Sequence, residues 1–331
     1  MRPFTYTRAA SVADAVASVA AGGADTRFLA GGTTLYDLMK LGVEAPAHIV
    51  DVNALTELAS IETDGDALVL GALARMSDVA EDPVVRRDYP ALSESLWRAA
   101  SQQLRNMASV GGNLLQRTRC AYFRGGPPFP CNKREPGSGC AAHGGLDRGH
   151  AVLGGSEACV AVYPGDWAVA LVAFDAAVDV VGPGGPRTIA VEALHREPGA
   201  LPHIETVLTP GDMIAAIRVP KSPVGRGSTY HKIRDRESYA FALAAAAVAL
   251  EMDGDVVRSA RIALGGLATR PWRCRQAETL LIGERLTHDM RRAAGEAALA
   301  GAVAGGSNGF RIELGVRTVV DALMIARERA R

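Results

Sequence analysis

Four of the five cysteines in this 331-residue chain lie in one stretch, at Cys120, Cys131, Cys140 and Cys159. Ten, eight and eighteen residues separate them in turn, and Gly, Pro and basic residues are frequent between them. Thiolates bind zinc and iron–sulfur clusters, but structural zinc sites usually contain paired cysteines roughly two to four residues apart. The wide spacing therefore favours a [4Fe–4S] cluster over zinc, with buried free thiols as the remaining alternative.

The residues around these cysteines suit a cluster of net negative charge. Four basic side chains are placed to offset that charge: Arg119, Arg124, Lys133 and Arg134. We also expect backbone N–H groups of residues 137–139 to bond cluster sulfur. His143 and His150 lie nearby, and we interpret them as loop histidines bonded to backbone, without a metal role. Cys274 stands apart and is interpreted as an ordinary core or surface thiol.

A glycine pair in a different part of the chain has the geometry of a phosphate site. Gly31-Gly32 follows a short apolar segment and precedes a helical pattern, with Thr33 and Thr34 directly after it. Backbone N–H groups in such a turn are free to donate, and glycine lets a pyrophosphate approach closely. A plain strand-to-helix turn is the alternative.

A second pair, Gly111-Gly112, lies about 80 residues further on, between Ser109 and Asn113. Together the two pairs favour a dinucleotide held from both sides, without choosing between FAD and NAD. The alternative for this pair is an ordinary helix C-cap.

Two further charged positions are candidates for contacts with a cofactor. Asp166 precedes an apolar run, where a carboxylate could bond ribose or ribityl hydroxyls or simply cap a helix. Lys232, Arg234 and Arg236 alternate along an expected strand. A cation there could stabilise a reduced flavin, and a solvated basic strand edge is the alternative. We find no nucleophile, P-loop or paired-carboxylate motif, so we assign no catalytic residue to the chain.

The elements that must position these residues follow from apolar periodicity and turn chemistry. In residues 1–60 we expect a helix at 11–22, a strand at 27–30, a helix at 33–41 and a strand at 48–52. In 61–214 we expect a strand at 68–70, one long helix at 91–109 and an irregular cysteine-rich loop, 117–160. In 215–331 we expect a strand at 229–233, a hairpin at 240–264 that turns at Asp253-Gly254, and helices at 287–304 and 310–329.

Composition narrows the class of protein. Lys+Arg and Asp+Glu are balanced at 36 each, so the chain has no global field that would attract nucleic acid. No run of eighteen apolar residues predicts a membrane span, and the N-terminus does not resemble a secretory signal. We therefore expect a cytoplasmic protein, with co-export to the periplasm on a partner as the alternative.

Several motifs together resemble one family. They are LAGGTTLYDLMK at 29–40, SVGGNLLQRTRC at 109–120, KIRDRESYAFALA at 232–244 and ALGGLATRPWR at 263–273. The chain resembles the FAD-binding medium subunit of the xanthine dehydrogenase/aldehyde oxidoreductase (molybdenum hydroxylase) family over nearly its whole length. The inserted loop CNKREPGSGC at 131–140 resembles the bacterial periplasmic-type aldehyde oxidoreductase branch.

The resemblance implies an α+β fold. Residues 1–60 and 61–214 would form a two-part FAD-binding domain of the vanillyl-alcohol-oxidase (PCMH) type. Residues 215–331 would form an α/β flavoprotein domain of the carbon monoxide dehydrogenase type. It also implies that FAD contacts fourteen residues, namely Leu29, Ala30, Gly31, Gly32, Thr33, Thr34, Leu35, Tyr36, Ser109, Gly112, Asn113, Thr118, Asp166 and Lys232. The implied [4Fe–4S] ligands are Cys120, Cys131, Cys140 and Cys159.

The implied function is electron transfer within a heterotrimer. A large subunit with a molybdenum cofactor would oxidise an aldehyde or N-heterocycle, and a small subunit with [2Fe–2S] clusters would pass the electrons to FAD on this chain. The substrate, the terminal acceptor and the role of the [4Fe–4S] cluster, relay or structural staple, stay open. The alternatives are a stand-alone flavin oxidase and a non-catalytic iron–sulfur or zinc redox sensor.

Overall fold

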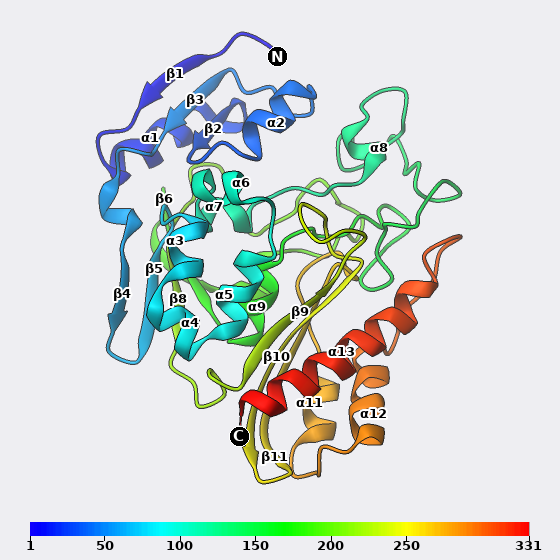
Figure 1. The fold of residues 1–331 in the computed structure, drawn as a ribbon. Helices are drawn as coiled ribbons and strands as arrows, with labels where there is room; N and C mark the ends of the chain where they lie inside the picture. The colour runs from blue at the N-terminus through cyan, green and yellow to red at the C-terminus, as the bar shows by residue number, and fades with distance from the viewer. Residues whose placement is uncertain (331) are drawn as a thin grey trace.

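A computed structural model describes residues 1–330 and contains three sheets, each covered by helices (Figure 1). The strands are β1 (Thr5–Arg8), β2 (Thr26–Leu29), β3 (His48–Asp51), β4 (Ile61–Asp64), β5 (Ala67–Gly71), β6 (Ala177–Gly182), β7 (Gly185–Ala190), β8 (Met213–Pro220), β9 (Ser228–Ile233), β10 (Ala244–Asp253), β11 (Val256–Gly265) and β12 (Trp272–Arg273). The α-helices are α1 (Val12–Gly22), α2 (Leu35–Lys40), α3 (Met76–Glu81), α4 (Pro83–Asp88), α5 (Pro90–Trp97), α6 (Gln102–Met107), α7 (Val110–Leu114), α8 (Ala121–Arg124), α9 (Trp167–Ala173), α10 (Val191–Leu194), α11 (Arg275–Leu281), α12 (His288–Ala298) and α13 (Phe310–Arg329).

The N-terminal unit is a parallel sheet in the order β1-β3-β2, with α1 packed against it. Ser11 caps α1 by accepting a hydrogen bond from the backbone N–H of Asp14, and Gly23 ends the helix with a positive φ of 57°. One apolar face of α1 packs into a small core with Val50 and Val52. Strand β2 lies at the edge of this sheet, and the first glycine pair follows it directly.

The central unit is an antiparallel sheet in the order β4-β5-β8-β6-β7, covered by α3, α5, α7 and α9. Helix α9 is completely buried beneath it. Strand β8 crosses the predicted boundary at 214 and pairs with both β5 and β6. The predicted domain boundaries stay a prediction.

The expected single helix at 91–109 is wrong: the chain forms α5, α6 and α7 instead. The break falls at Ala100, whose φ is +47°, where the last carbonyls of α5 are taken by cationic side chains. The carbonyl of Arg98 accepts from Lys232 Nζ at 3.0 Å and Arg234 Nη1 at 3.1 Å. Because these distant donors satisfy the helix end, the chain turns there, and Ser101 then caps α6.

The C-terminal unit is an antiparallel sheet in the order β12-β11-β10-β9, and α11, α12 and α13 cover one face (Figure 1). The predicted hairpin of β10 and β11 is confirmed, with a turn at Gly254 whose φ is +58°. Both faces of β10 are buried: Ala245 and Ala247 pack with the central unit, whereas Ala246 and Val248 pack under α13. Small side chains let the two layers approach this strand closely, which explains its alanine-rich sequence.

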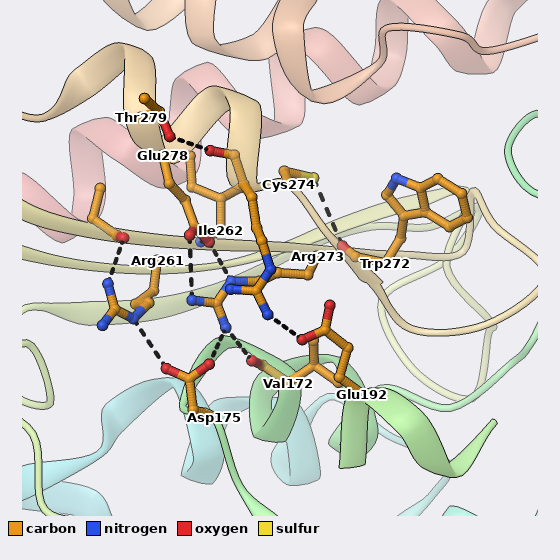
Figure 2. Close-up of polar contacts among 12 residues, drawn as sticks. Val172, Asp175, Glu192, Arg261, Ile262, Trp272, Arg273, Cys274, Glu278 and Thr279 are labelled. Atoms are coloured by element: carbon orange, nitrogen blue, oxygen red, sulfur yellow. Dashed lines mark hydrogen bonds and ion pairs between the residues drawn. The ribbon is translucent and has the colours of Figure 1, made fainter. Parts of the chain in front are cut away.

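A buried ion-pair network joins the central and C-terminal units (Figure 2). Arg273, whose side chain is only 2% exposed, donates to the Val172 carbonyl and to Asp175 at 2.8 Å across the junction. Its guanidinium also pairs with Glu278, which in turn accepts from the backbone N–H of Ile262 at 2.8 Å. The two units are therefore fixed against each other by hydrogen-bonded charges. No helix within residues 1–330 is long and apolar enough to cross a membrane.

Candidate functional site

A cavity of about 290 Å³ lies between the N-terminal and central units. It is lined by both glycine pairs and by ten of the fourteen residues predicted to contact FAD, namely Leu29, Ala30, Gly31, Gly32, Thr33, Thr34, Leu35, Ser109, Gly112 and Asn113. The N-terminal unit contributes the loop between β2 and α2, and the central unit contributes α7. The tertiary structure thus brings together two motifs about 80 residues apart.

The first glycine pair presents free donors to this cavity. Within residues 1–330, the backbone N–H groups of Gly32, Thr33 and Thr34 make no hydrogen bond. Gly32 has a φ of +72°, which favours glycine, and Gly31 sits against the backbone at Met107. A Cβ on Gly31 would lie 2.0 Å from the Met107 carbonyl oxygen. The loop is therefore a set of outward N–H donors suited to phosphate oxygens, held tightly against the central unit.

The second glycine pair acts differently. Its N–H groups are bonded within the protein: Gly111 donates to the Ala72 carbonyl at 2.9 Å and Gly112 to Ser109 Oγ at 3.3 Å. A Cβ on Gly111 would lie 2.6 Å from that of Ala72, so the pair allows α7 to pack closely. Asn113 Oδ1 is buried without a hydrogen-bond partner in the described chain and is available to a donor such as a ligand hydroxyl.

Four predicted contact residues do not line the cavity. Tyr36 is exposed on α2, and the Thr118 hydroxyl donates to the Val162 carbonyl at 2.9 Å. Asp166 and Lys232 are both buried and form an ion pair of 2.8 Å. Lys232 also donates to the carbonyl at the end of α5. In this structure the two side chains therefore link β9, α5 and the start of α9.

Sequence reasoning missed the charged side chains that border the cavity. Arg117 and Glu44 both line it and pair at 2.5 Å, and Arg117 also pairs with Glu205. Glu205 in turn binds Lys133 of the cysteine loop at 2.9 Å. Burial alone would raise the pKa of the Glu205 carboxyl, but Lys133 and Arg117 outweigh it and hold that pKa below its usual range. Arg117 is within the quoted family motif, whereas its partners are distant in sequence.

A second, smaller cavity is lined by all four clustered cysteines, Cys120, Cys131, Cys140 and Cys159. All are free thiols of the 117–160 loop, and Cys131 and Cys140 pair with each other in an isolated antiparallel β-bridge. Among residues 1–330, no three His, Cys, Asp or Glu side chains are gathered closely enough to hold a single metal ion. The donor set fits a cluster, because in a [4Fe–4S] cubane each cysteine binds a different iron.

The two cavities share a wall. Phe123 is completely buried and lines the cysteine cavity, and the guanidinium carbon of Arg117 lies 4.6 Å from the centre of its ring. Burial raises the pKa of the Cys120 thiol to about 11. Metals bind the thiolate, so metal binding at Cys120 would release its proton. A redox group in the cysteine cavity would therefore lie next to whatever occupies the first cavity.

The expected bonds from residues 137–139 to sulfur are not formed. Gly137 and Gly139 donate instead to Asn132 Oδ1, at 3.1 and 2.8 Å, and shape the loop. The imidazole of His150 does reach a thiol: its Nε2 lies 3.2 Å from Cys120 Sγ. Burial lowers the pKa of the His150 ring, which keeps it neutral.

Comparison with known proteins decides the family. Residues 2–222 match the family described as the FAD binding domain in molybdopterin dehydrogenase, and residues 228–326 match the CO dehydrogenase flavoprotein C-terminal domain. The chain belongs to this flavoprotein family. As a member, it is an FAD-binding oxidoreductase subunit.

Individual relatives agree with this assignment. The aldehyde oxidoreductase FAD-binding subunit PaoB of Escherichia coli is 46% identical over 333 residues, covering 100% of both chains. The carbon monoxide dehydrogenase medium chain of Hydrogenophaga pseudoflava is 28% identical, covering 90% of this chain and 86% of its own. A solved structure of carbon monoxide dehydrogenase from that organism superposes with a TM-score of 0.78 at 27% identity, covering 99% of this chain and 98% of its own.

The predicted family, α+β flavoprotein fold and FAD cofactor are thereby confirmed. The fourteen individual FAD contacts and the four cluster ligands stay predictions.

Proposed function

We propose that this flavoprotein is the electron-transfer subunit of a heterotrimeric molybdenum hydroxylase that oxidises aldehydes or N-heterocycles. Its partners would be a large subunit with a molybdenum cofactor and a small subunit with [2Fe–2S] clusters. Bound FAD supplies chemistry that accepts electrons singly and releases them singly or in pairs. The 46% identity with an aldehyde oxidoreductase FAD-binding subunit supports aldehydes as the first substrate class to test.

The observation that carries the proposal is the cavity itself. Free N–H donors at Gly32, Thr33 and Thr34 face it from one side and α7 closes the other. The charged side chains of the cavity are already engaged: Arg27 pairs with Glu44, and Asp212 pairs with Arg187. No acid or base in the described lining is left free to take a proton from a substrate. This arrangement supports a flavin that exchanges electrons with a partner rather than a stand-alone oxidase.

The test is to purify the chain alone and as a complex with its partners. We expect FAD in both preparations, molybdenum only in the complex, and aldehyde turnover with an artificial acceptor only in the complex. Aldehyde oxidation by the isolated chain would establish the stand-alone oxidase instead. A preparation without flavin would favour the redox-sensor alternative.

The proposal includes a [4Fe–4S] cluster on Cys120, Cys131, Cys140 and Cys159. The shared cavity, the four free thiols and the positive Lys133 beside them support it. Lys133 is nearly buried and its charge would oppose that of the cluster.

Cys131→Ser tests the cluster directly, with Cys274→Ser as the matched control. Cys274 is also buried, but its thiol bonds the Trp272 and Ala298 carbonyls in the C-terminal unit. We expect Cys131→Ser to lose cluster iron and to retain FAD and molybdenum in the complex, whereas the control retains all three. Full iron in Cys131→Ser, or zinc in place of iron in the native protein, would contradict the assignment.

A further inference from the structure

The imidazole of His150 is the one histidine ring among the described residues that reaches a clustered cysteine. Its Nε2 lies 3.2 Å from Cys120 Sγ, and the ring itself lines the cysteine cavity. By contrast His143, which is also on this loop, contacts the backbone carbonyl of Ser156 and no sulfur. The geometry therefore singles out one histidine of the two.

The ring of His150 is buried, and its two nitrogens have different surroundings. His150 is only 6% exposed, and its Nδ1 is buried without a hydrogen-bond partner within residues 1–330. A neutral imidazole carries one N–H, and that N–H is stabilised only where an acceptor faces it. The sulfur of Cys120 lies within hydrogen-bond distance of Nε2, so a proton on Nε2 has an acceptor there.

The C-terminal unit holds this histidine in place. Arg311, which is 1% exposed, lies in the first turn of α13 and donates to the His150 carbonyl at 2.8 Å. One turn of chain earlier, the Asp147 carboxylate accepts from the backbone N–H groups of Gly306 and Ser307, both at 2.7 Å. Segment 147–150 is therefore fixed at both ends by residues more than 150 positions away, which limits the movement of the ring relative to Cys120.

We propose that His150 is a positioning residue that donates an Nε2–H···Sγ hydrogen bond to Cys120 and thereby raises the reduction potential of the cluster on this loop. This inference rests on the [4Fe–4S] assignment proposed above. Reduction by one electron adds negative charge to the cluster, and a hydrogen bond to a ligand sulfur strengthens as that charge grows. The donor therefore stabilises the reduced state more than the oxidised state.

The test compares His150→Phe and His150→Gln in the purified complex, with His143→Gln as the control. Phe keeps a flat ring without a donor, and Gln offers an amide N–H of similar reach. The readouts are iron content and the midpoint potential of the cluster, from an EPR-monitored titration with dithionite. We expect His150→Phe to retain iron and to titrate at a more negative potential. A tenfold change in the ratio of reduced to oxidised cluster would be about 59 mV. His150→Gln should recover part of the shift, and the control should match the native protein.

The outcomes separate this inference from the cluster assignment. Native protein without iron would refute the assignment itself. Iron retained in His150→Phe with an unchanged potential would overturn the role of His150. Loss of iron from both His150 variants but not from the control would also overturn it, because the histidine would then be needed to assemble the cluster rather than to tune it.

Discussion

The contact between Gly31 and the backbone at Met107 offers a sharp test of the cavity. In Gly31→Ala the new Cβ would lie 2.0 Å from the Met107 carbonyl oxygen and 3.0 Å from Ala108 Cα, whereas real Cβ contacts are essentially never under 3.0 Å. Relief requires the β2–α2 loop and the α6–α7 segment to separate by about 1 Å, because no flexible side chain is available to yield. The variant therefore displaces the free N–H donors from α7.

The size of the effect follows from the cost of overpacking. Forcing one extra methyl into a closely packed contact costs about 1–3 kcal/mol. The apoprotein can release that strain by opening the cavity, but FAD needs both walls, so the cost falls on binding. If this cost of about 1–3 kcal/mol is taken from the free energy of FAD binding, the dissociation constant for FAD rises roughly 5- to 150-fold. We expect Gly31→Ala to be purified with substoichiometric FAD and to need more FAD for half-saturation in a fluorescence titration.

Gly184→Ala is the matched control. Gly184 lies in the turn between β6 and β7, outside the cavity, and its Cβ would meet nothing within 4 Å. We expect this variant to bind FAD like the native protein, with an unchanged melting temperature. Native FAD affinity in Gly31→Ala would refute the close contact on which the description of the cavity depends.

Three further predictions follow from single interactions. Arg273→Met should lower the free energy of unfolding by about 3–5 kcal/mol, because it leaves the buried Glu278 without its cationic partner. Arg258 forms an exposed ion pair with Asp253, so Arg258→Met should cost under about 1 kcal/mol. Denaturant unfolding measures both free energies. Equal decreases in the two variants would show that the buried network contributes no more to stability than an exposed ion pair. The pKa of Glu205 is held below the usual 4.5, so its stabilisation is complete above that pH and is lost as the pH falls through the lowered value. The melting temperature of the native protein should therefore drop more steeply in acid than that of Glu205→Gln, and parallel profiles would contradict the shift. Ser109→Ala removes the N-cap of α7 at a cost of about 1 kcal/mol and should weaken FAD binding severalfold in the same titration; an unchanged affinity would place the hydroxyl outside the site.

The structure explains which expectations could be read from neighbouring residues. A positive φ at Gly32 and at Gly254 is a local property, so the first glycine loop and the β10–β11 turn were both predictable. The helix at 91–109 failed for the opposite reason. Its break at Ala100 depends on Lys232 and Arg234, which bond the end of α5 from a strand more than 130 residues away.

The same division applies to the candidate site. Free donors at the first glycine pair follow from the local turn, and the four cysteines were predictable as one group because they lie in one 40-residue segment. The second pair has the same composition, yet the N–H of Gly111 is consumed by the distant Ala72 carbonyl, and no local pattern predicts that bond. Likewise, the preference of Gly137 for Asn132 over sulfur depends on how the loop closes.

The sequence by itself determined the family and, through the resemblance that its motifs carry, FAD as the cofactor, because short motifs are made of neighbouring residues. Only the tertiary structure decided that the two glycine pairs face one cavity, that Asp166 and Lys232 pair with each other, and that His150 rather than His143 faces a thiol. Each of these outcomes depends on contacts between segments far apart in the chain. Packing of the whole fold selects such contacts, and the composition of either segment alone does not specify them.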